Sequence, residues 1–189
     1  MKTIADPLAL GARHRARGRF ARAESLLRQS VALAEAAGPR EDARLAAALN
    51  ALGLLCKDLA RYDEGRACYE RALSLLEGAP GATPDDVATL YHNLGGIEHA
   101  RGEHAAGEAF ARRGLALRKL AVDGDPHALA ADMAALAALL DGQRRDDEAE
   151  ALYVEALRTF EGESHPDALE IAEEVHWRVF ARVPIAGVE

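Results

Sequence analysis

The side chains that could hold a metal ion or perform acid–base catalysis are few and scattered. His92 and His99 are seven residues apart, so on a helix they share one face, and Glu103 follows four residues after His99. This set needs a third ligand from elsewhere before it can hold a divalent cation. The sequence has no His-Glu-x-x-His motif, no glycine-rich phosphate loop and no Gly-x-Ser-x-Gly nucleophile motif. We therefore predict no enzymatic activity, no metal site and no cofactor.

The charge of the chain argues against a nucleic acid or an anionic membrane as partner. The formal net charge is -8, but residues 1–44 hold nine Lys and Arg against five Asp and Glu, whereas residues 45–189 hold fourteen against twenty-six. The cations of the first segment include a run of arginines, namely Arg13, Arg15, Arg17, Arg19 and Arg22. This run is either a solvated end of the fold or a contact for phosphates or an acidic partner. The opposite charges of the two halves would also allow a homo-oligomer.

Cysteine use and hydrophobicity predict a cytoplasmic location. Cys56 and Cys68 are twelve residues apart, which is not a zinc-binding pattern, and we expect both thiols to be reduced and half-buried. Asp6 and Pro7 interrupt the region where a signal peptide needs an apolar stretch. The longest uncharged apolar run, residues 133–140, is too short to span a membrane. The abundance of alanine and arginine is typical of a bacterial protein from a GC-rich genome.

The composition favours helices that pack closely through small side chains. Alanine is the most abundant residue and aromatic residues contribute only 5%, which suits an all-α protein and not a β-sandwich. Thr83 and Asp125 precede prolines and are expected N-caps. Gly, Pro and apolar spacing together predict nine helices, at residues 6–17, 20–37, 41–59, 62–77, 84–101, 104–122, 126–142, 146–160 and 166–182.

An internal repeat with a constant period organises these helices in pairs. Three columns, whose members are spaced by 42, hold only small residues in all four copies: Gly11, Gly53, Gly95 and Ala137; then Ala23, Gly65, Gly107 and Ala149; then Ser30, Ala72, Gly114 and Ala156. Small side chains at these points let two antiparallel helices approach closely. Such a helical hairpin cannot bury its apolar faces alone, so it stacks on its neighbours.

The second copy resembles the tetratricopeptide repeat (TPR). Its matching residues are Leu49, Leu52, Gly53, Tyr62, Gly65, Tyr69 and Ala72. The 42-residue spacing, with Pro84-Asp85 and His165-Pro166-Asp167 at the junctions, is similar to the kinesin-light-chain type of repeat. The resemblance implies an all-α, right-handed α-solenoid in one TPR domain over residues 1–183, with repeats at about 5–38, 41–78, 84–122 and 126–161. Residues 166–182 would form a capping helix and residues 184–189 a flexible tail.

The same resemblance implies a scaffold that binds a peptide or helix of a partner protein in the concave groove. The first helix of each pair lines the groove, and we expect this surface to include Arg15, Asn50, Leu54, Lys57, His92, Asn93 and His99. In the family, amides such as Asn50 and Asn93 can hold the backbone of an extended peptide, but they can equally bond to neighbours in the fold. The positions of the family's chaperone-binding clamp carry mostly Leu and Ala here, which argues against chaperone tails as ligands. The alternative function is a self-assembling structural or regulatory module.

Overall fold

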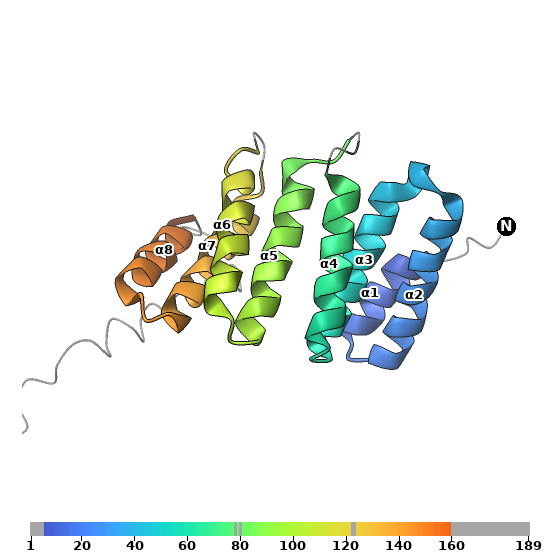
Figure 1. Cartoon of the computed structure of the whole chain (residues 1–189), viewed down its shortest axis with the longest axis horizontal. Helices are drawn as coiled ribbons and strands as arrows, with labels where there is room; N and C mark the ends of the chain where they lie inside the picture. Colours follow the sequence, from blue (N-terminus) through green and yellow to red (C-terminus); the bar gives the residue numbers. More distant parts are fainter. Residues whose placement is uncertain (1–5, 78, 80, 122–123, 160–189) are drawn as a thin grey trace, which may run out of the picture.

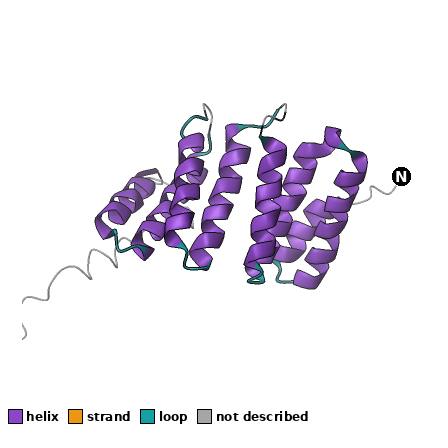
Figure 2. Cartoon of the chain, viewed as in Figure 1, coloured by secondary structure: helices purple, strands orange, loops and turns teal. Residues whose placement is uncertain are grey.

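The computed structural model describes residues 6–77, 79, 81–121 and 124–159, which form eight α-helices and no strand (Figure 2). The predicted helix 166–182 and tail 184–189 lie outside this part of the chain. The helices, joined by short loops and one 3-10 turn (Pro39–Glu41), are α1 (Pro7–Ala16), α2 (Phe20–Ala37), α3 (Asp42–Asp58), α4 (Tyr62–Leu76), α5 (Pro84–Ala100), α6 (His104–Arg118), α7 (Pro126–Gly142) and α8 (Asp146–Thr159). Seven of them match the predicted spans to within one residue at each end.

The helix α6 ends four residues earlier than predicted. After Arg118 the backbone hydrogen bonds span three residues instead of four. The N–H of Leu120 donates to the carbonyl of Leu117, and that of Ala121 donates to the carbonyl of Arg118. Bonds of this three-residue span close a tighter turn than the α-helix, so the chain leaves the helix before the predicted end.

Side chains fix the helix starts that follow a proline junction. The Thr83 hydroxyl accepts a hydrogen bond from the Asp86 backbone N–H, and the Asp86 carboxylate accepts one from the Thr83 N–H, which forms a complete capping box. Asp125 accepts from the N–H of His127 in the same way at α7. Both predicted N-caps are confirmed.

Each helical hairpin turns through one residue with a left-handed backbone. These residues are spaced by 42 and have φ between 56° and 79°: Gly18, Ala60, Gly102 and Arg144. Glycine takes this conformation without a steric cost, whereas alanine and arginine do not. The repeat therefore fixes the turn geometry in all four copies, although only two of them have glycine there.

The hairpins stack in chain order and form two layers (Figure 1). Within each repeat the two helices pack against each other, and each second helix packs against the first helix of the next repeat. The first helices also contact one another, α1 with α3, α3 with α5 and α5 with α7, whereas no second helix makes a comparable contact with the next second helix in the described chain. The first helices are therefore the more closely spaced layer, which lies on the inner side of a curved stack.

The small-residue columns occupy the places where helices touch. A Cβ atom on Gly53 would lie 2.5 Å from the Tyr69 ring, and one on Gly107 would lie 2.5 Å from Leu139. All members of the three columns are buried. Cys56 and Cys68 are free thiols, and both are buried instead of half-buried because they pack in the α3–α4 core.

Candidate functional site

The inner layer presents a surface made by α3 and α5 at the centre of the stack. Asn50, Leu54 and Lys57 lie partly exposed along one face of α3, and His92 and His99 lie along the matching face of α5. Positions four and seven residues apart point in nearly the same direction on a helix, which explains this alignment. Of the predicted groove residues in α3 and α5, only Asn93 is buried, at 8% exposure.

The two predicted groove amides bond to each other. Asn93 donates its Nδ2 to Asn50 Oδ1 across the α3–α5 boundary at 2.7 Å. Asn93 therefore joins two repeats and does not offer its amide on the surface. Asn50, which is partly exposed, retains its NH2 group for another acceptor.

A buried polar network supports the groove face of α5. His92 Nδ1 lies 2.8 Å from Asp132 Oδ1, and Arg118 Nε donates to Asp132 Oδ2 at 2.9 Å. Arg118 also reaches the Thr89 hydroxyl at 3.3 Å and the Asp85 carboxylate at 3.5 Å. Because His92 is held through Nδ1, its Nε2 is left for a ligand on the partly exposed side of the ring.

Sequence reasoning did not identify Asp132 or Arg118 as part of this site. Asp132 was nevertheless visible as the one carboxylate within the apolar stretch from Ala128 to Leu140. A carboxylate at a core position of a helix needs a partner, because an unpaired buried charge is costly. That rule would have predicted the ion pair without naming Arg118, which lies fourteen residues earlier.

The cation of Lys57 lies over the gap left by Gly96. A Cβ atom on Gly96 would lie 3.0 Å from Lys57 Nζ, so a side chain at this position would require the ammonium group of Lys57 to shift. Lys57 has no ion-pair partner within the described residues. The pKa of nearby His99 is lowered by burial first, then by the positive charges of His104 and Lys57, while Asp141 opposes the shift.

Arg15 is less available than the sequence suggested. Its guanidinium donates to the Asp58 carboxylate at 2.8 Å, which links α1 to the end of α3. The predicted surface therefore separates into a paired cation at α1 and a cation at α3, Lys57, that has no ion pair with the described part of the chain.

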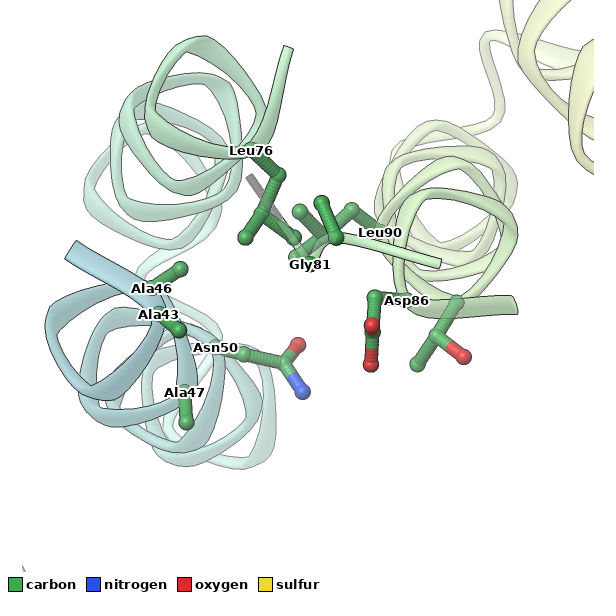
Figure 3. A pocket seen from close by; sticks show the side chains of 10 residues that line it. Ala43, Ala46, Ala47, Asn50, Leu76, Gly81, Asp86 and Leu90 are labelled. Carbon is green, nitrogen blue, oxygen red and sulfur yellow. The ribbon is translucent and has the colours of Figure 1, made fainter. Parts of the chain in front are cut away.

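A cavity of about 180 Å³ opens beside Asn50, between the second and third repeats (Figure 3). Asn50 projects into the space between α3 and α5, and Leu76 and Leu90 close the cavity from α4 and α5. The walls are otherwise small or polar, from Ala43, Ala46, Ala47, Gly81, Ala82, Asp86 and Thr89. This arrangement suits an apolar side chain whose neighbouring backbone can bond to an amide.

The described residues contain no cluster of three His, Cys, Asp or Glu side chains that could hold a metal ion. His92 faces Asp132, and the His99 ring lies 5.2 Å from the His104 ring, so these histidines do not converge with Glu103. The hypothetical metal site of His92, His99 and Glu103 is therefore wrong for this part of the chain. None of the described helices is long and apolar enough to cross a membrane.

Comparisons with known proteins identify the repeat. A tetratricopeptide repeat model matches residues 44–119 and 86–162, and another tetratricopeptide repeat model matches residues 8–37. No curated protein matches the chain significantly.

Several solved structures share the fold. One is BtubC (BKLC) from P. vanneervenii, with a TM-score of 0.71 and 24% identity over 83% of this chain and 63% of that one. Another holds the nearly identical TPR-like repeats assigned to a kinesin light chain of Podosopora anserina, with a TM-score of 0.72 and 18% identity over 96% and 89%. The N-terminal domain of stress-induced protein-1 from C. elegans has a TM-score of 0.55 and 16% identity over 71% and 97%. The chain thus spans less than two thirds of BtubC, and these identities establish a common fold alone.

Proposed function

Because the chain belongs to the tetratricopeptide repeat family, we propose that it is a non-enzymatic scaffold that binds a segment of a partner protein on its inner layer of helices. Tetratricopeptide repeats generally mediate protein–protein interaction. The observation that carries the proposal is the cavity at Asn50, which lies on the same face of α3 as the cation of Lys57.

The spacing of these two features defines the ligand. Asn50 and Lys57 are separated by two helical turns, or about 10 Å along the axis. About three residues of extended peptide cover that distance. The preferred segment would therefore place an apolar side chain in the cavity and a carboxylate near Lys57, with its backbone beside the free NH2 group of Asn50.

The test uses a variant that closes the cavity and reverses the cation. Ala47 is exposed and lines the cavity, so Ala47→Tyr fills the opening, and Lys57→Glu repels the carboxylate. A matched control makes the same changes on the outer layer, with Ala67→Tyr on α4 and Arg113→Glu on α6, both at exposed positions. Both variants should keep the circular dichroism and melting temperature of the unchanged chain to within a few degrees.

Affinity purification with quantitative mass spectrometry identifies the partners, and isothermal titration calorimetry with the partner's segment as a peptide measures the affinity. We expect the groove variant to weaken the affinity at least tenfold, since it removes an apolar contact and reverses an ion pair. The control variant should retain the affinity. If the two variants bind the peptide equally well, the inner layer is not the binding surface.

A further inference from the structure

Two junctions between repeats contain the same apolar contact. Ile97 of α5 reaches Gly65 of α4, and Leu139 of α7 reaches Gly107 of α6, each so closely that a Cβ atom on the glycine would lie within 2.8 Å. Leu55 of α3 is the equivalent residue at the first junction, one repeat period before Ile97, and it is fully buried. These side chains fasten the first helix of a repeat to the second helix of the repeat before it.

Arg13 stands at this position in the first repeat, one period before Leu55. It is exposed, on the side of α1 where the later repeats bury an aliphatic residue. An apolar helix face placed there would have to desolvate the guanidinium, which is costly without a charged partner. The open side of the first hairpin is therefore built for a polar surface.

A second repeated contact indicates what that polar surface carries. Arg61 donates to Glu24 of the preceding repeat at 3.0 Å, and Arg145 donates to Glu108 of its preceding repeat at 2.8 Å. Each pair is separated by 37 residues, so the two contacts are equivalent. Arg19 is the same residue of the first repeat, one period before Arg61.

The open side of the first hairpin concentrates cations that have no ion pair with any described residue. They are exposed and come from the end of α1 and the start of α2: Arg13, Arg17, Arg19 and Arg22. All four surround His14, whose pKa is lowered by burial first and then by their positive charges. The first turn of α2 also has no acidic residue, whereas the equivalent turn of α4 has Asp63 and Glu64.

We propose that the open side of the α1–α2 hairpin docks an acidic helical segment of a partner protein, in which a glutamate binds Arg19 as Glu24 binds Arg61 and Glu108 binds Arg145. Further carboxylates on the same helix face bind Arg13, in the last turn of α1, and Arg17, which directly follows that helix. This surface is separate from the inner layer, so the proposal goes beyond the binding of a segment in the groove.

Two other occupants fit this surface less well. A nucleic acid is longer than the surface that four guanidinium groups cover. Its remaining phosphates would be repelled by residues 45–189, which carry a net charge of -12. A second copy of the chain offers α8, where Glu150 is equivalent to Glu24 and Glu108. In that arrangement, however, Arg13 would take the place of Leu139, which packs on Gly107. It would therefore face Ala149, the equivalent of Gly107, which offers no carboxylate.

The test uses an alanine-based helical peptide with glutamate at every fourth position, and a glutamine version of the same peptide as a probe of charge. Binding to the full chain is measured by fluorescence anisotropy at about 0.15 M salt, where weak long-range attraction is screened. The test variant is Arg13→Gln, Arg17→Gln and Arg19→Gln together. The control variant replaces three other exposed arginines without described ion pairs: Arg113→Gln, Arg144→Gln and Arg158→Gln.

We expect the glutamate peptide to bind the unchanged chain and the control variant equally, and the test variant about tenfold more weakly, as the loss of three exposed ion pairs implies. The glutamine peptide should bind none of them. Equal affinity of the test and control variants would overturn the proposal. So would tighter arginine-dependent binding of a single-stranded oligonucleotide, or concentration-dependent dimers that disappear only in the test variant. The variant with Ala47→Tyr and Lys57→Glu should still bind the peptide, which separates this proposal from the groove.

Discussion

The buried pair of Arg118 and Asp132 gives the sharpest test of how the groove face is held. Their side chains are only 7% and 4% exposed, and their closest atoms are 2.9 Å apart. Removing one charge of a buried pair leaves the other uncompensated, which typically costs 3–5 kcal/mol. Asp85, 3.5 Å from Arg118, compensates part of that charge. We therefore expect Asp132→Asn to lower the free energy of unfolding by about 3 kcal/mol, or the melting temperature by roughly 6–12 °C.

Urea denaturation followed by circular dichroism measures this loss in four proteins: the unchanged chain, Asp132→Asn, Arg118→Met and the double variant. The double variant removes both charges, so it should lose about 2 kcal/mol less than the sum of the two single variants. Arg71→Met serves as a control, because its pair with Glu35 is exposed and should contribute less than about 1 kcal/mol. Additive losses, or a loss in Asp132→Asn no larger than in Arg71→Met, would refute the assignment of a coupled buried pair.

Three further measurements test the turns, the seams and the groove. Ala60→Gly and Arg144→Gly should each raise the free energy of unfolding by up to about 1 kcal/mol in thermal denaturation. Glycine removes a strain of about 1–2 kcal/mol from the left-handed backbone, and this gain is larger than the entropy cost of ordering glycine on folding. Burial raises the pKa of Glu108, but its hydrogen bonds to neighbouring amide and guanidinium groups lower it by more. The net result is a pKa below the ordinary value of 4.5. The stabilisation from Glu108 should therefore be complete above pH 4.5 and be lost as the pH falls through the depressed pKa of the folded chain, and urea denaturation of Glu108→Gln should lack this component. The pKa of His99, followed by NMR, should rise towards 6.5 in Lys57→Met; an unchanged value would mean that the two side chains are not neighbours.

Local sequence signals predicted the fold well because most helix boundaries have a local cause. Thr83 and Asp125 begin helices through their own side chains, and both were expected. The end of α6 has no such signal: Leu120 and Ala121 are compatible with a helix, and the departure at Arg118 depends on a short turn that the sequence does not specify. The constant period of the repeat then determined which helices pair, because the three buried columns of small residues lie where two helices touch.

The candidate site was predicted less completely because it depends on how repeats meet. Asn50 and Asn93 were expected either to hold a peptide backbone or to bond to neighbours in the fold, and the hydrogen bond between them arises only where α3 and α5 come into contact. Asp132 and Arg118 belong to different repeats, so no local spacing brings them together. A periodic sequence thus fixes which helix faces are inward, while pairs of polar residues between repeats are visible only in three dimensions.

Departures from the repeat are more informative about function than the repeat itself. The column of Leu55, Ile97 and Leu139 is aliphatic and buried in three of the four copies, where it packs at the junctions between repeats. When one copy changes such a column to a charge, the fold loses a packing contact, and the change is stable only where solvent or a charged partner meets it. Arg13 is such a change, and Arg19 is equivalent to Arg61 and Arg145, which both bind glutamates. Arg13 and Arg19 lie on the same hairpin, so one acidic helix could bind both, and the inner layer would remain free for a second partner.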